Sequence, residues 1–213
     1  MPRRDRSEVA HGATNDENCS ETQGLLPPII HQVGQTITVS GPGRIERFLR
    51  QAHRETPPVD GMIVLTTERS ATELLRSWKV DTASGNRAAI GIIDTRSKGQ
   101  YIADIYRRIP IHYTTADGDI ERTAISLTEL VESLSTTPAQ RFHLVVDSYT
   151  AFSGSLAPEE RAQLLNTFHS QIDGYQLYVT DGSTYDSLDP YIDGMIWVED
   201  GSDETVRTRY QRF

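Results

Sequence analysis

The stretch TITVSGPGRIERFLRQ, residues 36–51, combines a short strand, a glycine-rich turn and the start of a helix. The β-branched run TITVS predicts a strand, and a helical pattern begins directly after Gly41-Pro42-Gly43. A strand that turns through glycines into a helix is the arrangement by which backbone N–H groups at a helix N-terminus hold phosphate. The stretch therefore raises the question of whether this turn binds an anion or only has the shape of one that does.

The alternation of strand and helix continues along the rest of the chain. Short apolar runs rich in β-branched residues predict strands that are covered on both faces, as in a parallel sheet. The expected strands are TITVS at 36, GMIVLTT at 61, AAIGIID at 88, FHLVVDS at 142, YQLYVTD at 175 and GMIWVED at 194, and the expected helices cover 43–54, 70–79, 126–135 and 157–172. After the turn at 201–203 the chain alternates with a period of two, which predicts a hairpin with GMIWVED.

These elements predict an α/β fold. Strands that alternate with helices form right-handed crossovers, which give a three-layer, mostly parallel sheet with helices on both faces and a C-terminal antiparallel edge hairpin. Two of the helices begin with capping-box spacing, at Ser70 with Glu73 and at Ser126 with Glu129. Residues 1–28 are polar, aperiodic and closed by two prolines, so we expect a disordered tail at 1–28 and a single domain at 29–213.

Composition excludes several classes of function. The 213 residues contain no apolar run long enough to span a bilayer and no secretory signal, so we expect a cytoplasmic protein without a membrane partner. The net charge of −9 repels nucleic-acid phosphate, so no nucleic-acid partner is expected. The single Cys19 allows neither an intrachain disulfide nor a cysteine zinc cluster.

The basic residues are almost all arginine. Only Lys79 and Lys98 are lysines, and the other 19 of the 21 basic residues are arginines. Together with the acidic balance, this pattern is typical of proteins from salt-loving archaea. A genome of high GC content also favours arginine over lysine, so both explanations stay open.

Polar residues follow most of the expected strands. In a sheet of this kind ligands lie beyond the carboxyl ends of the strands, where Glu68, Asp94, Asp147 and Asp181 would gather. Carboxylates at these positions suit a metal or nucleotide site. They are equally suited to capping the turns and helices that follow the strands.

The order of these segments resembles the RecA/KaiC branch of the P-loop ATPases. The matching runs are the Gly41 turn, VLTTERSATELL, FHLVVDSYTAF, LYVTDGST and YIDGMIWVED, which together span roughly residues 33–213. In particular the chain is similar to uncharacterised KaiC-like proteins of halophilic archaea that lack the phosphate-loop signature. The resemblance implies a RecA-like fold, places Glu68 where the family has a glutamate that activates water, and places Asp147 at the Walker B carboxylate that helps to hold magnesium.

The opening stretch departs from a working phosphate loop, G-x-x-x-x-G-K-[ST]. Gly41 takes the first glycine, but Glu46 falls at the second glycine, Arg47 at the lysine and Phe48 at the hydroxyl. Glu46 brings a negative charge to the place of the phosphate, and Phe48 cannot ligate a metal. The remaining candidates for a weak anion site are Gly41, Gly43, Arg44, Arg47 and Asp147.

Three functions are compatible with these residues. The first is a non-hydrolysing, KaiC-like regulatory or scaffolding protein that acts through protein partners or self-association and needs no cofactor or metal. The second is a divergent ATPase that binds ATP weakly, with Glu68 as catalytic base and Asp147 holding Mg²⁺. The third is a signalling domain with an acidic cluster.

Overall fold

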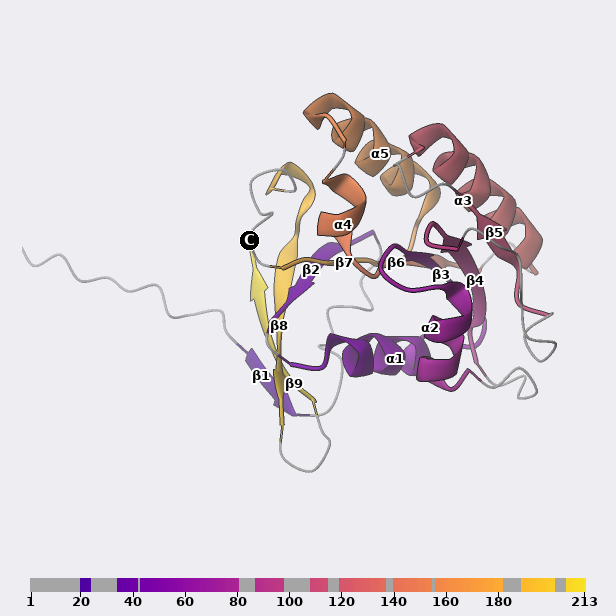
Figure 1. Ribbon diagram of the computed structural model, residues 1–213. Coiled ribbons are helices and arrows are strands. Elements are labelled where there is room, and N and C mark those ends of the chain that lie inside the picture. The colour runs from indigo at the N-terminus through magenta and orange to yellow at the C-terminus, as the bar shows by residue number, and fades with distance from the viewer. Residues whose placement is uncertain are drawn as a thin grey trace, which may run out of the picture.

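The computed structural model describes residues 20–23, 34–41, 43–80, 87–97, 108–114, 119–136, 140–154, 156–181, 189–201 and 206–213. Within these ranges nine strands form one sheet in the order β1-β9-β8-β2-β7-β6-β3-β4-β5 (Figure 1). The strands are β1 (Ser20–Gln23), β2 (Thr36–Ser40), β3 (Gly61–Thr66), β4 (Ala89–Asp94), β5 (Ile111–Tyr113), β6 (Phe142–Val146), β7 (Gln176–Val179), β8 (Gly194–Asp200) and β9 (Val206–Arg212). The helices are α1 (Ile45–Glu55), α2 (Ala71–Trp78), α3 (Ile120–Leu134), α4 (Tyr149–Ser153), α5 (Pro158–Gln171) and the 3-10 helix η3 (Asp189–Tyr191).

The sheet is parallel except at one side. The seven strands from β8 across to β5 all run in the same direction. β9 is antiparallel to β8 and, on its other edge, to β1. The predicted fold class, a mostly parallel α/β sheet with a C-terminal antiparallel hairpin, is confirmed and fits a RecA-like three-layer fold.

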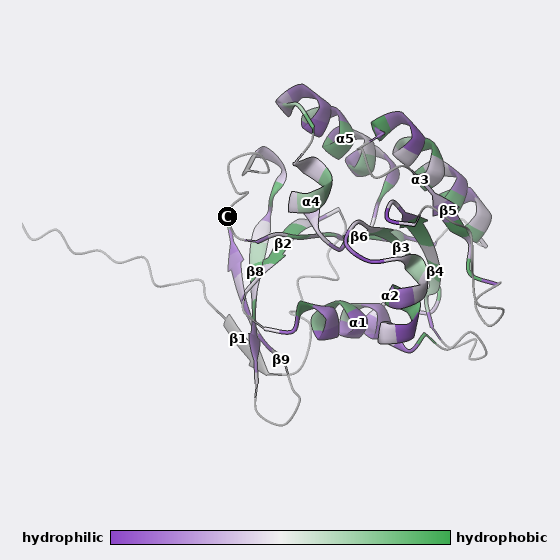
Figure 2. Ribbon diagram, in the orientation of Figure 1, coloured by the Kyte–Doolittle hydropathy of each residue, from purple (hydrophilic) through white to green (hydrophobic). Residues whose placement is uncertain are grey.

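Each face of the sheet is covered by its own set of helices. Along β3, Met62 and Val64 point into a core shared with α1 and α2, whereas Ile63 and Leu65 point into a second core with α3, α4 and α5. This alternation follows from the two-residue period of a strand. The apolar strands therefore lie between two helical layers whose outer sides are polar (Figures 1 and 2).

The helix starts were predicted with mixed success. At α2 the capping box is present, because Ser70 Oγ accepts from the Glu73 N–H at 3.3 Å and a Glu73 carboxylate oxygen accepts from the Ser70 N–H at 2.9 Å. The predicted start of the next helix at Ser126 is wrong. α3 begins at Ile120, since Asp119 accepts the Arg122 N–H at 2.9 Å and supplies an earlier N-cap, which leaves Ser126 buried inside the helix.

Four residues of the expected disordered tail form a strand. Residues 20–23 are β1, which pairs with β9 from Ser20 opposite Tyr210 to Gln23 opposite Arg207. The physical reason is that β9 would otherwise present a row of unpaired backbone groups at the edge of the sheet. The other residues of the expected tail, Cys19 included, lie outside the described residues.

A chain of buried polar groups joins the N-terminal ends of β3, β6 and β7. The Tyr175 N–H donates to His143 Nδ1 at 3.0 Å, so His143 Nε2 carries the proton that faces Asp60 Oδ2 at 3.3 Å. The Tyr175 hydroxyl lies 2.8 Å from Thr56 Oγ1, and its ring stacks on His143. Burial lowers the pKa of His143, which agrees with a neutral core histidine whose hydrogen bonds are made.

Replacement of Ile37 tests the burial of β2 beneath α1. Ile37 is fully buried in the core beneath α1, so Ile37→Ala should lower the free energy of unfolding by about 2–5 kcal/mol, measured by urea denaturation. Ile125→Ala is the matched control, because Ile125 is 51% exposed on α3 and its truncation should change stability by less than about 0.5 kcal/mol. Equal effects at the two positions would contradict the assignment of β2 to the core.

Candidate functional site

The carboxyl ends of three strands bring the predicted site residues to one edge of the sheet. The Gly41 turn follows β2, Glu68 follows β3 and Asp147 follows β6. β7 lies between β2 and β6, so the turn and Asp147 belong to strands that are not neighbours. The edge is the one where ligands of parallel α/β sheets are found.

The glycines of the turn serve its contact with β8. Gly41 has φ +129°, and a Cβ at this position would lie 2.2 Å from the Val198 carbonyl oxygen. A Cβ on Gly43 would lie 2.6 Å from the Glu199 carbonyl carbon, and the Gly43 N–H donates to the Val198 oxygen at 2.9 Å. The turn therefore packs on the backbone of β8, which accounts for its glycines without a phosphate.

Carboxylates occupy the N-terminus of α1. The Arg44 N–H, at the N-cap, donates to Asp200 Oδ1 at 3.0 Å, and Arg44 Nε lies 3.9 Å from Asp200 Oδ2. Glu46 adds a second negative charge in the first turn. A helix N-terminus favours a nearby anion, and here the Asp200 carboxylate of the protein itself takes that place. An incoming phosphate would meet two carboxylates.

Asp147 is buried and held by Thr67. Its Oδ1 accepts from the Thr67 N–H at 2.7 Å and from Thr67 Oγ1 at 2.8 Å. Its side chain is 2% exposed, and this burial raises the pKa of Asp147 although the Thr67 hydrogen bonds oppose the shift. One of its two oxygens is thus occupied by the loop after β3.

Arg69 supplies the positive charge of the site. Its guanidinium lies 3.1 Å from Glu46 Oε2 through Nη1 and 3.9 Å from Asp147 Oδ2 through Nε. Arg69 was missed by the sequence analysis. A signal was present, since Glu46 at a glycine position of the phosphate loop needs a nearby cation, and an arginine directly follows Glu68.

The other predicted residues do not converge on Asp147. Glu68 is exposed to solvent. Arg47 is half-buried on α1, where its N–H donates to the Arg44 carbonyl at 2.8 Å, and Phe48 is a core residue with 2% exposure. At the end of β4, Asp94 accepts the Ala71 N–H at 2.8 Å and so caps the start of α2. This carboxylate has the structural role that the sequence analysis left open.

The residues of this edge do not fit magnesium and ATP. The N-terminus of α1 is taken by Asp200, and Asp147 Oδ1 is bonded to Thr67. Asp147 Oδ2 makes no hydrogen bond within the described residues and faces Arg69 Nε at 3.9 Å, a cation where magnesium would have to lie. Within the described ranges no group of three His, Cys, Asp or Glu residues could hold a metal ion. The helices of these ranges include none that is long and apolar enough to cross a membrane.

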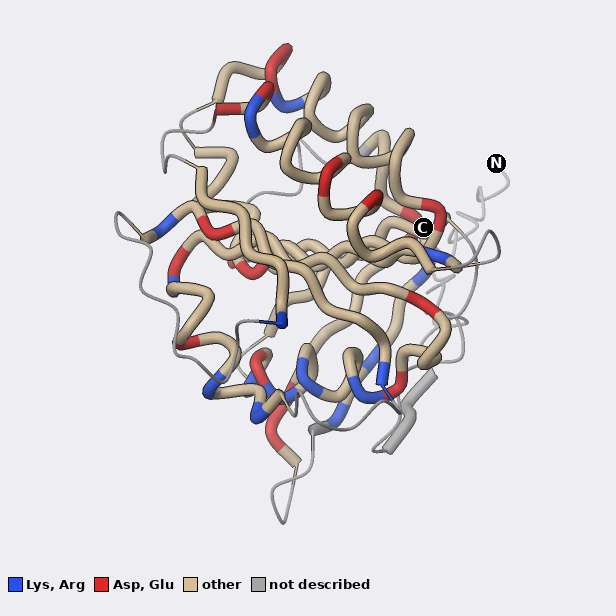
Figure 3. Tube along the Cα trace, turned by 90° about the vertical axis from the view of Figure 1, so that its right-hand side faces the viewer, with Lys and Arg blue, Asp and Glu red and all other residues tan. Residues whose placement is uncertain are grey.

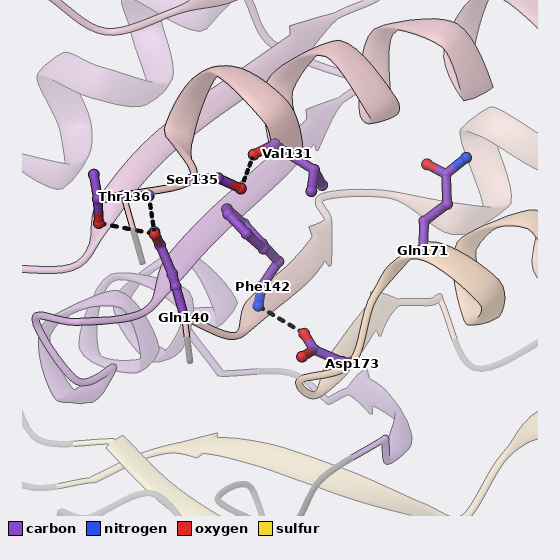
Figure 4. A pocket seen from close by; sticks show the side chains of 7 residues that line it. All are labelled: Val131, Ser135, Thr136, Gln140, Phe142, Gln171 and Asp173. Atoms are coloured by element: carbon purple, nitrogen blue, oxygen red, sulfur yellow. Dashed lines mark hydrogen bonds between the residues drawn. The ribbon is translucent and has the colours of Figure 1, made fainter. Parts of the chain in front are cut away.

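A separate hollow of about 560 Å³ lies at the opposite edge of the sheet, between the C-terminal ends of α3 and α5 (Figure 4). Two of its polar side chains, Gln140 and Asp173, are used within the fold, whereas the buried Gln171 Oε1 has no hydrogen-bond partner among the described residues. Gln140 Oε1 accepts from the Thr136 N–H at 2.7 Å and from its hydroxyl at 3.0 Å, and Asp173 Oδ1 accepts from the Phe142 N–H at 2.9 Å. These bonds fasten the start of β6 to its neighbours, which is a structural role.

Comparison with known proteins gives the fold. No family model and no curated protein matches the sequence. A solved structure of an uncharacterised protein from Pyrococcus horikoshii, in complex with an unknown peptide, is similar with a TM-score of 0.56 and 10% identity over 85% of this chain and 84% of that one. An ATPase from the type III secretion system of pathogenic bacteria gives a TM-score of 0.47 and 13% identity, over 78% of this chain and 51% of that one. At these identities the first likeness shows a shared fold alone.

The pH dependence of stability tests the buried state of Asp147. Its pKa is higher in the folded than in the unfolded protein, so its contribution favours folding at low pH and is lost as pH rises through the folded-state pKa. Asp147→Asn keeps an oxygen that accepts the hydrogen bonds of Thr67, and because the amide does not ionise, the variant does not lose stability at this position as pH rises. Relative to the original protein, the variant should therefore gain stability between pH 4 and 7, by about 1.4 kcal/mol for each unit of pKa shift.

The measurement is urea denaturation at several pH values. Glu132→Gln, at an exposed position on α3, is the control and should show no such gain. An Asp147→Asn variant that loses stability relative to the original protein as pH rises would show that Asp147 is stabilised as a carboxylate, contrary to this assignment.

Proposed function

We propose that the protein is a non-hydrolysing, KaiC-like pseudo-ATPase that acts as a regulatory or scaffolding module through protein contacts. The observation that carries this proposal is the ion-pair chain from Glu46 through Arg69 to Asp147. In an active relative the corresponding place would hold a phosphate, a lysine and a magnesium ion. Here one internal arginine lies between two carboxylates, so the position of the lysine and the metal is filled from within the protein, and negative charge stands where phosphate would approach.

The N-terminus of α1 supports the same conclusion. Asp200 already receives the Arg44 N–H that a phosphate would need, and the Gly41 turn packs on β8. To bind nucleotide the protein would have to break these contacts and bring phosphate beside Glu46. The exposed position of Glu68 gives no support to a catalytic water next to Asp147.

The hairpin β8–β9 is the surface we propose for protein contacts. Trp197 on β8 is 36% exposed and pairs across the hairpin with Arg209, and Arg207 and Arg212 are also exposed on β9. Exposed tryptophan and arginine are the residue types enriched at protein interfaces. The acidic, arginine-rich composition supports a halophilic archaeal origin, in which high salt would screen the repulsion between two acidic copies.

Titration calorimetry with ATP and magnesium tests the loss of nucleotide binding. In molar potassium chloride we expect no saturable heat up to about 1 mM nucleotide. The reason is that the α1 N-terminus and Asp147 are engaged by Asp200, Thr67 and Arg69. Micromolar binding that disappears in Asp147→Ala would overturn the proposal and establish the ATPase alternative as the better one.

Sedimentation equilibrium tests the hairpin as a contact surface. We expect reversible self-association in molar salt, weakened at least about fivefold by Trp197→Ser, since a buried aromatic anchor contributes more than about 1 kcal/mol. Val59→Ser is the matched control, because Val59 is 67% exposed beyond α1 and away from the hairpin. A protein that stays monomeric at all salt concentrations, or equal effects of the two variants, would exclude self-association through this surface.

A further inference from the structure

A small pocket lies at the N-terminal edge of the sheet, opposite the Gly41 turn. It forms between His53 near the end of α1, the segment that leads into β4, and the segment that leads into β5. Its volume is about 180 Å³, and apolar wall residues include Val80, Ile109 and Leu134. Apolar cavities of about 150 Å³ hold a molecule the size of benzene. The pocket therefore suits a molecule with a few carbon atoms and is too small for a nucleotide.

His53 lines this pocket and carries a buried ring nitrogen without a hydrogen-bond partner. The residue is 2% exposed and donates a hydrogen bond to the backbone of Ala88, whereas its Nε2 has no hydrogen-bond partner among the described residues. A buried polar atom left in this state costs about 1–3 kcal/mol. Of the buried side-chain atoms without a hydrogen-bond partner in the described ranges, this is the one whose residue lines the pocket. A polar group of a ligand in the pocket would supply the missing partner.

Four arginines make the surroundings of the pocket positive. Arg87 and Arg108 line it, and Arg50 and Arg54 lie one turn apart on the adjoining end of α1. Burial lowers the pKa of Arg54, and the charges of Arg50 and Arg87 lower it further. Figure 3 shows basic residues gathered in the helical layer of α1 and α2. In a chain of net charge −9, mutually repelling arginines at a pocket mark a place where an anion would be stabilised.

We infer that this pocket binds a small organic oxyanion, a carboxylate or a phosphate monoester that carries a short apolar group. Arg87 and Arg108 contact the oxyanion, because the guanidinium fork matches carboxylate and phosphate oxygens. His53 Nε2 contacts the same head group, and the apolar walls hold the rest of the molecule. The site is distinct from the carboxyl edge of the sheet and does not depend on the proposed function.

Binding should be linked to protonation of His53. In the free protein burial lowers the pKa of His53, and the charges of Arg87 and Arg54 act in the same direction. The Trp78 ring, at a centroid distance of 5.9 Å, carries no charge that would oppose them. An anion at Nε2 favours the imidazolium, so binding takes up a proton and the affinity rises as pH falls from about 8 to 6.

Calorimetry with three probes tests the pocket: butyrate, n-butyl phosphate and inorganic phosphate, with 1-butanol as the neutral control. We expect one equivalent of an anion to bind with a dissociation constant between about 10 µM and 1 mM. His53→Asn keeps a donor to Ala88 and removes Nε2, and Arg87→Gln removes one guanidinium. Each should weaken binding about tenfold or more, while Arg122→Gln on the exposed side of α3 should not.

The outcomes separate the ligand chemistries. Binding of butyrate alone identifies a carboxylate site, and binding of n-butyl phosphate alone identifies a phosphate-ester site. Both are forms of the inference. Absence of saturable binding by all three probes up to about 10 mM, or equal weakening in Arg122→Gln, overturns it. If His53→Asn does not fold, Arg87→Gln and the pH dependence of the original protein decide the question, since affinity that does not change with pH contradicts a contact at Nε2.

Discussion

The candidate site is governed by one constraint, that a carboxylate buried between strands must have partners. Asp147 lies in the middle of the sheet edge with almost no exposure, and an ionised group in that position is costly unless it is paired. Thr67 from the neighbouring loop bonds Oδ1 twice, and Arg69 sets a positive charge 3.9 Å from Oδ2, which makes no hydrogen bond within the described residues. Arg69 in turn is positioned by Glu46 on α1, so that one buried charge joins two strand ends and a helix across the sheet.

The sequence allowed the fold class to be predicted because the central strands are buried on both faces. A run such as GMIVLT has no polar residue until its end, and only a sheet between two helical layers can bury it. The parts that were missed have weaker local signals. β5 has three residues, and β1 is defined by its partner β9 rather than by any pattern of its own. The start of α3 was misplaced because a serine with capping spacing also fits the interior of a helix.

The edge of the sheet that carries the candidate site was predicted from the sequence, but the side-chain contacts within the site were predicted only in part. The ends of β2, β3 and β6 follow from the fold, so Gly41 and Asp147 could be placed at one edge of the sheet from sequence. The ion pairs and hydrogen bonds that occupy this edge could not be predicted. The pairing of Arg44 with Asp200 joins residues 156 positions apart, and the ion pairs of Arg69 depend on how α1 lies against the loop after β3. Contacts of this kind arise from tertiary packing and leave no local pattern.

The place of β2 in the sheet has a consequence for synthesis on the ribosome. β2 lies near the start of the described chain, yet both of its neighbours, β7 and β8, belong to the last quarter of the sequence. The bond from the Thr36 N–H to Asp193 Oδ2 spans 157 residues. An apolar strand emerges early and stays unpaired until translation is nearly complete, which favours slow folding and exposes the nascent chain to aggregation.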